Sequence, residues 1–265
     1  MKNSISAILT SVCVLGAASA ASAQGLGAGD LTVAPPVVGA TSPTQLAFPG
    51  IFGVASAIAA PSGSGFAALS YVNPRGGVAN SDGDGDFAVG YTIGSPVEAV
   101  SLTGSINVLG LQPFGDSGTL AISASRMLRA GGNSATFAAI AAGNLMGWGD
   151  ARNNRETYTF AVSHLVGIAT ESGVEIPLHV SVGYGNQATL SDDGRGVSGP
   201  GAFLGMGVGV TETLSASLSA TETQLNVGFS LVVPALPGLG LSLGVFDVTD
   251  NTSRQQWSLG ASFSF

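Results

Sequence analysis

The stretch that decides the fold of this chain is its last eleven residues, Gln255–Phe265, which read "QQWSLGASFSF". Apolar side chains fall on alternate positions, at Trp257, Leu259, Phe263 and Phe265, and glutamine, serine or glycine stands between them. Alternation of this kind predicts a β-strand with one apolar and one polar face. A chain that ends on such a strand needs an apolar environment for one face and a neighbouring strand for its exposed edge.

The same alternation recurs along the chain in segments of about ten residues, the length of a transmembrane β-strand. In each of them the second face carries small or hydroxylated residues. These segments predict an all-β, antiparallel up-and-down transmembrane barrel of about twelve strands, within a range of about ten to fourteen. The clearest are "DFAVGYTI" at 86–93, "EIPLHVSVGY" at 175–184, "LSASLSAT" at 214–221 and "QLNVGFSLV" at 224–232.

The composition is that of neither an ordinary soluble domain nor a helical membrane protein. Only 9% of the residues are charged, against about 25% in typical soluble domains. There are 40 glycines, and the mean hydropathy is +0.42. Beyond the first twenty-three residues, however, no run of eighteen apolar residues is long enough for a membrane helix. A secreted glycine-rich β-solenoid is the rival fold, and the lack of a fixed repeat counts against it.

Residues 1–23 have the features of a cleaved export signal. Lys2 provides the positive start, the apolar run 8–18 provides the hydrophobic core, and Ala21-Ser22-Ala23 provides the cleavage motif. A transmembrane anchor is the alternative, but the run is short and is interrupted by serine and threonine. We expect the mature chain to begin at Gln24.

The expected mature chain lacks thiol chemistry and is acidic. The only cysteine of the full sequence, Cys13, and its only lysine both lie in the signal. Removal of the signal leaves seven arginines against sixteen acidic residues and a net charge of −9. An acidic chain without lysine is a poor binder of nucleic acid. We predict neither a nucleic-acid partner nor a cofactor.

Residues 24–64 precede the first clear strand and are unusual for a leader. They hold a single charge, Asp30, and the apolar run "LAFPGIFGVASAIA" at 46–59. Disordered leaders are polar and charged, so this segment is expected to plug the lumen. The alternatives are that it adds a strand or packs outside the barrel, and that it is a mobile linker. The predicted organisation is a signal at 1–23, this segment at 24–64 and the barrel at 65–265.

The predicted inward face is small and neutral, with serine, glycine, alanine and threonine at most positions. The most polar candidates for the lumen are His179 and Asn226, together with Ser181 and Ser230. A lumen of this kind suits passive diffusion of small neutral or weakly polar solutes, gated by residues 24–64. The alternatives are a closed structural or surface-display barrel with acidic loops and, third, a hydrolase that uses His179 beside a serine.

The stretch "DGDGD" places Asp82, Asp84 and Asp86 at alternate positions, as calcium-binding loops do. An EF-hand loop that began at Asp82 would need glycine at the position of Phe87 and glutamate at the position of Ile93. The stretch is therefore interpreted as a solvated acidic loop, with weak divalent-ion binding as the alternative. No metal site is predicted.

The export signal, the two-faced segments and the final "GASFSF" at 260–265 resemble bacterial outer-membrane β-barrel proteins. The resemblance implies that Trp257, Phe263 and Phe265 form part of a strand that the barrel-assembly machinery reads. We expect an integral, monomeric outer-membrane protein that contacts membrane lipid and lipopolysaccharide and admits small solutes. Enzymatic activity is not expected.

Overall fold

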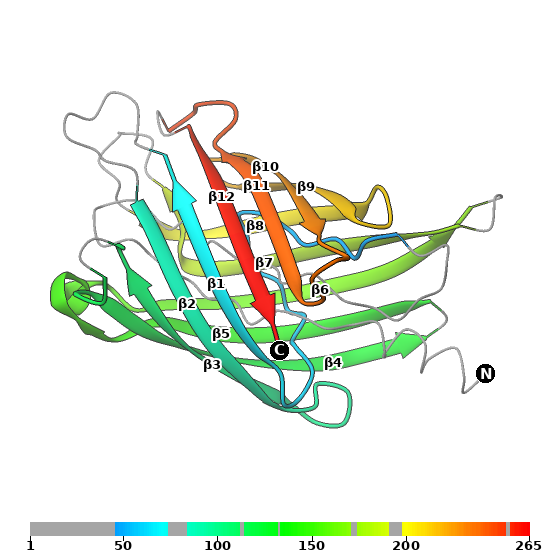
Figure 1. The fold of residues 1–265 in the computed structure, drawn as a ribbon, viewed down its shortest axis with the longest axis horizontal. Coiled ribbons are helices and arrows are strands. Elements are labelled where there is room, and N and C mark those ends of the chain that lie inside the picture. The colour runs from blue at the N-terminus through cyan, green and yellow to red at the C-terminus, as the bar shows by residue number, and fades with distance from the viewer. Residues whose placement is uncertain are drawn as a thin grey trace.

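The computed structural model describes residues 46–73, 84–111, 114–131, 133–170, 174–190, 198–252 and 255–265. Within these ranges, twelve strands form one closed antiparallel barrel, with each strand paired to its neighbours in the chain (Figure 1). The strands are β1 Gly65–Val72, β2 Asp84–Gly94, β3 Ser101–Leu109, β4 Gly118–Gly131, β5 Ser134–Trp148, β6 Thr157–Ala169, β7 Glu175–Leu190, β8 Ser198–Gly209, β9 Leu214–Thr221, β10 Leu225–Val232, β11 Leu239–Phe246 and β12 Gln256–Ser264. The prediction of an antiparallel barrel of about twelve strands is confirmed.

The last strand closes the barrel against the first. β12 pairs with β1 from Phe66↔Ser264 to Val72↔Ser258, and its other edge pairs with β11. The final residue continues this pairing, since the Gly65 amide donates to the Phe265 carbonyl at 2.8 Å and the Phe265 amide donates back at 3.0 Å. Closure leaves no open edge, which lipid cannot tolerate because it offers no hydrogen-bond partner to backbone groups.

The distribution of polar and apolar side chains over the two faces of the barrel wall is the reverse of that in a soluble protein. Leu204 and Tyr184 are each 54% exposed on the outside, whereas Ser163 and Ser181 are completely buried inside. Side chains at alternate strand positions point to opposite faces, so this reversal follows directly from the alternation in the sequence. The chain is therefore a transmembrane β-barrel, with an apolar exterior for lipid and a largely polar interior.

None of the described residues belongs to a helix of the length and hydropathy that a membrane crossing requires. The one helix within the described ranges is the 3₁₀ turn η1, Gly149–Asn153.

The two ends of the barrel are distinguished by the chain termini. We call the end at which Gly65 and Phe265 meet the terminal end, and the opposite end the loop end.

Strands β4 to β7 have 13 to 16 residues, whereas β9 to β12 have eight or nine. The barrel wall is therefore longer on the β4–β7 side than on the β9–β12 side.

Candidate functional site: the lumenal segment and its wall

Residues 46–60, which we call the lumenal segment, lie inside the barrel without regular secondary structure (Figure 1, in blue). The segment enters at the terminal end, where the Ala47 amide donates to the Thr211 carbonyl in the β8–β9 turn at 2.7 Å. It turns at Gly53, whose φ of 83° is the left-handed conformation that glycine adopts without strain. It then returns to the start of β1, so it forms a re-entrant loop with its apex at Gly53.

Serines on β9 hold the apex of this loop. The Phe52 amide donates to Ser217 Oγ at 3.1 Å, and Ser219 Oγ donates to the Phe52 carbonyl at 2.5 Å. A side chain at Gly53 would lie 2.6 Å from Asn226 Nδ2, so the apex has no room for a larger residue. These contacts bring the loop close to Asn226 at the loop end of β10.

Serines on β4, β6 and β7 hold the returning leg. Ser181 Oγ donates to the Ala55 carbonyl at 2.8 Å, and the Ala57 amide donates to Ser163 Oγ at 2.8 Å. Ser125 Oγ on β4 donates to the Ala57 carbonyl. These backbone groups of the segment are satisfied by wall hydroxyls and not by a β-ladder, so the segment is not a strand of the sheet.

His179 joins the two legs of the loop. Its Nδ1 lies 3.1 Å from the Pro49 carbonyl on the entering leg, and its Nε2 lies 3.2 Å from Ser56 Oγ on the returning leg. A carbonyl oxygen only accepts, so Nδ1 carries the proton and Nε2 accepts from the Ser56 hydroxyl. The ring is completely buried. This burial and both of its hydrogen bonds are those of a structural bridge and not of a base that meets a substrate.

The apolar side chains of the segment pack in two ways, either against large inward side chains of the wall or into the space above wall glycines, which we call glycine sockets. Phe137, Leu165 and Phe203 point into the barrel and form one buried cluster with Ile51 and Ile58. These three inward residues were not predicted, since the inward face was expected to be small and neutral. Their positions fall on the inward side of the strand alternation, which is the signal that could have identified them.

The glycine sockets lie on β8, β10 and β11. A side chain at Gly228 on β10 or at Gly244 on β11 would collide with the ring of Phe52, and that ring lies 4.4 Å from the ring of Phe246. Gly205 on β8 makes the same kind of room for Ile51. These glycines therefore leave room for the side chains of the segment. We call the inward faces of β6 to β11 the segment wall.

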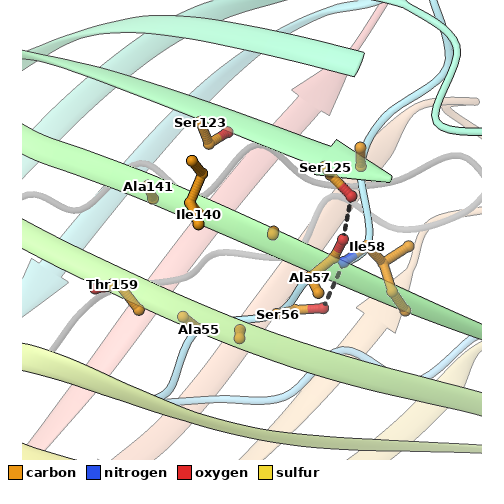
Figure 2. Close-up of a pocket in the computed structure, with 12 residues that line it drawn as sticks. Ala55, Ser56, Ala57, Ile58, Ser123, Ser125, Ile140, Ala141 and Thr159 are labelled. Atoms are coloured by element: carbon orange, nitrogen blue, oxygen red, sulfur yellow. Dashed lines mark hydrogen bonds between the residues drawn. The ribbon is translucent and has the colours of Figure 1, made fainter. Parts of the chain in front are cut away.

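Space remains on both sides of the returning leg. One pocket of about 350 Å³, a volume that includes open solvent, lies between the leg and strands β4 to β6 (Figure 2). A second, of about 370 Å³ counted in the same way, lies between the apex and the wall near Thr157 and Phe203. The lining of the two pockets is alanine, serine, threonine, glycine, glutamine and apolar side chains, without an ionisable residue.

The structure places the residues predicted for the lumen as follows. His179 and Ser181 are completely buried on the inward face of β7, and both contact the lumenal segment. Asn226 is 1% exposed and donates to Ser219 Oγ at 3.2 Å. Ser230 shares the inward face of β10 and is half-buried.

The residues of the predicted assembly signal lie on the outer face of β12. Trp257 is 41% exposed, Phe263 45% and Phe265 66%. Trp257 packs against Tyr71 of β1 with ring centroids 5.6 Å apart, and Phe263 stacks on Phe265 at 6.2 Å. These rings lie at the two ends of the strand, where girdle aromatics of a membrane barrel belong.

The acidic stretch differs from the solvated loop that was expected. Asp84 begins β2, and Asp86 is a strand residue, 8% exposed, whose Oδ1 accepts from the Gly110 amide at 3.2 Å. Asp82 lies outside the described residues. Among the residues that the structure describes, no group of three His, Cys, Asp or Glu side chains is placed to hold a metal ion.

A second acidic residue, Asp247, lies in the β11–β12 connection. The side chain is completely buried at the loop end of β11. Its Oδ2 accepts from the Thr252 amide at 2.8 Å and from the Thr252 hydroxyl at 2.6 Å, while its own amide donates to Asn226 at 3.0 Å. The carboxylate therefore fixes the conformation of the β11–β12 connection by accepting hydrogen bonds from residues of that connection.

Neither a protein-family model nor a curated protein sequence matches the chain. Among solved structures, the chain is similar to the KdgM porin, with 8% identity, a TM-score of 0.49 and coverage of 76% of this chain and 99% of that one. The COG4313 outer membrane channel from Pseudomonas putida F1 has 13% identity, a TM-score of 0.49 and coverage of 78% and 97%. The NanC porin has 10% identity, a TM-score of 0.45 and coverage of 75% and 98%.

Proposed function

We propose that this protein is an outer-membrane channel for the passive diffusion of small neutral or weakly polar solutes, and that the lumenal segment is its gate. The observation that carries the proposal is the way the segment is held. Serine hydroxyls and His179 bind its backbone and Ser56, and no β-ladder does. The segment can leave without breaking a strand pair, because the barrel closes through β1 and β12 alone.

The chemistry of the wall supports neutral solutes. Once the segment moves, the hydroxyls of Ser163, Ser181, Ser217 and Ser219 become free to bind water or a passing solute. Neutral hydroxyls hydrogen-bond to uncharged polar groups but do not select ions, whereas selective ion channels line their constrictions with charged rings or carbonyls. Each wall hydrogen bond contributes about 1 kcal/mol, so a handful of them can hold the gate closed reversibly.

A disulfide lock tests the gate directly. Ser56 Oγ and Ser163 Oγ lie 3.4 Å apart, one on the segment and one on β6. The double variant Ser56→Cys/Ser163→Cys is therefore expected to form a disulfide, and the expected mature chain contains no other cysteine to compete. In planar bilayers the oxidised protein should stay closed, and reduction with dithiothreitol should restore opening events. The single variants Ser56→Cys and Ser163→Cys are the matched controls and should not respond to reductant.

The closed structural barrel is the competing function, and one observation favours it. Ala57 and Ile58 of the segment are at most 1% exposed, as tightly packed as a protein core. Equal current before and after reduction would remove the segment as the gate. Absence of current from the reduced lock, and also from a variant that cannot seat the segment, would establish the closed barrel instead.

A further inference from the structure

The inward residues of β3 and β4 form a second polar surface, away from most of the lumenal segment. β3 turns Ser101, Thr103, Ser105 and Asn107 inward, and these residues pair in register with Ser125, Ser123, Ala121 and Thr119 of β4. We call these eight residues the polar ladder, and each register pair a rung. Ser125 is the one ladder residue whose side chain is hydrogen-bonded to the segment in the described structure.

On the two rungs nearest the terminal end, the β3 hydroxyls are hydrogen-bonded. Thr103 Oγ1 lies 2.8 Å from Thr92 Oγ1 on β2, and Ser101 Oγ donates to the Ser125 carbonyl at 3.4 Å. These hydroxyls serve the barrel wall itself.

The rung nearest the loop end is different. Asn107 and Thr119 are completely buried, and within the described structure Asn107 Nδ2, Asn107 Oδ1 and Thr119 Oγ1 have no hydrogen-bond partner. Buried polar groups are nearly always paired, since each unpaired one carries a desolvation penalty. Three such atoms on one rung therefore indicate a place that is built to receive a partner.

From this rung we infer a binding site for a small, neutral, polyhydroxylated solute, which rests on the channel function proposed above and names the solute class. An amide offers two donors and an acceptor, and a threonine hydroxyl is both donor and acceptor. Adjacent hydroxyls of a polyol or sugar match this set, because each hydroxyl also donates and accepts. The side chains of the rung itself, an amide and a hydroxyl, are uncharged, and the Asp86 carboxylate on β2 accepts from the Gly110 amide.

The path to the site is along the lumen. Leu109 follows Asn107 on the same face of β3, and Ala151 of η1 packs on it in a small buried cluster at the loop end. The rung is shielded from that side, so we expect a solute to approach it from the lumen, part of which the lumenal segment fills. Binding at the rung should therefore be stronger in a barrel whose segment is displaced.

Trp148 is an indirect reporter of binding, since it pairs with Gly118 on the outward face of the wall, one position from Thr119. Its ring packs where a side chain at Gly118, the residue next to Thr119, would lie. The only other tryptophan, Trp257, can be removed as Trp257→Phe. Trp148 fluorescence is then titrated with glucose, and with fully methylated glucose as the control that lacks hydroxyl donors. The detergent must have no sugar headgroup. The titration is done on the resting barrel and on Gly228→Leu, which removes the socket of Phe52.

Glucose should give a saturable change, larger in Gly228→Leu, and methylated glucose should give none. Asn107→Leu and Thr119→Val keep side-chain volume but remove the polar groups, and together they should weaken glucose binding about tenfold or more. Thr92→Val, on β2 beside the Thr103 rung, should leave glucose binding unchanged. If Asn107→Leu fails to assemble, Thr119→Val alone should weaken binding about threefold.

Two results separate this inference from the channel proposal. Absence of a glucose response in both barrels, or an equal response in the Asn107→Leu/Thr119→Val variant, would mean that the rung binds water only, and it would overturn the site while the channel stands. Binding that depends on Asn107, in a protein that passes no solute into liposomes, would support the site and reject the channel.

Discussion

The segment wall and the polar ladder, on two sides of the lumen, are built from the same kinds of residue but differ in whether their polar groups are hydrogen-bonded. On the segment wall, Ser163, Ser181, Ser217 and Ser219 are each engaged with the lumenal segment. On the polar ladder, Asn107 and Thr119 remain without partners in the described structure. Glycines explain the difference, since Gly205, Gly228 and Gly244 hollow the segment wall to the shape of Ile51 and Phe52. Small side chains thus decide where the segment lies, and hydroxyls decide how firmly it is held.

The largest effect is expected from filling the glycine socket. In Gly228→Leu the new side chain occupies the place of the Phe52 ring, and overpacking of this kind costs about 1–3 kcal/mol. Single-channel recordings should show an open probability raised on the order of a hundredfold. Gly104→Leu is the control, because a side chain at Gly104 meets nothing within 4 Å. An open probability unchanged in Gly228→Leu would mean that the socket does not hold the gate.

A smaller effect is expected from removing the bridge between the two legs. His179→Phe keeps a ring of similar size but loses the hydrogen bonds to Pro49 and Ser56. Loss of two hydrogen bonds should raise the open probability about tenfold. His179→Gln, which retains a donor and an acceptor, should restore part of the closed state. Equal behaviour of the two variants would show that the ring acts by volume and not by hydrogen bonding.

A smaller effect again is expected from a single serine. Ser181→Ala removes the hydrogen bond to the Ala55 carbonyl and should raise the open probability about threefold. Thr92→Val removes a hydroxyl on the other side of the lumen, where Thr92 contacts Thr103 and not the segment. It should leave gating unchanged. If both variants open the channel to the same degree, the two sides do not differ in the way described above.

The smallest effect on gating is expected from Phe265→Ser, because this residue contacts neither side of the lumen. Its ring lies outside, 6.2 Å from that of Phe263, while its backbone pairs with Gly65. The proposed role of the terminal aromatic in recognition by the assembly machinery predicts a severalfold loss of heat-modifiable, folded protein in the outer membrane. The barrels that do assemble should gate normally. Wild-type amounts of folded protein would argue against the assembly signal.

Strand alternation made the barrel predictable. In "LSASLSAT" at 214–221, for example, the leucines face lipid and the serines face the lumen because successive side chains of a strand point to opposite faces. The same rule places Phe137, Leu165 and Phe203 inward, although large apolar side chains were not expected on that face. Asp86 was expected in a solvated loop because acidic side chains usually face water, whereas it is buried in β2 and accepts from the Gly110 amide, 24 residues away.

The sequence by itself determined the closed barrel, its approximate strand number and the orientation of its two faces, because these follow from a local period of two residues and from the need to pair every strand edge in lipid. The exact number of strands came from the structure. Only the tertiary structure decided what the lumen contains. Residues 46–60 have no period of their own. Serine hydroxyls from β4, β6, β7 and β9 hold their backbone, and glycines on β8, β10 and β11 make room for their side chains. Contacts of such sequence separation leave no local signal, which is why the loop, its sockets and the unpaired Asn107–Thr119 rung appear only in the folded barrel.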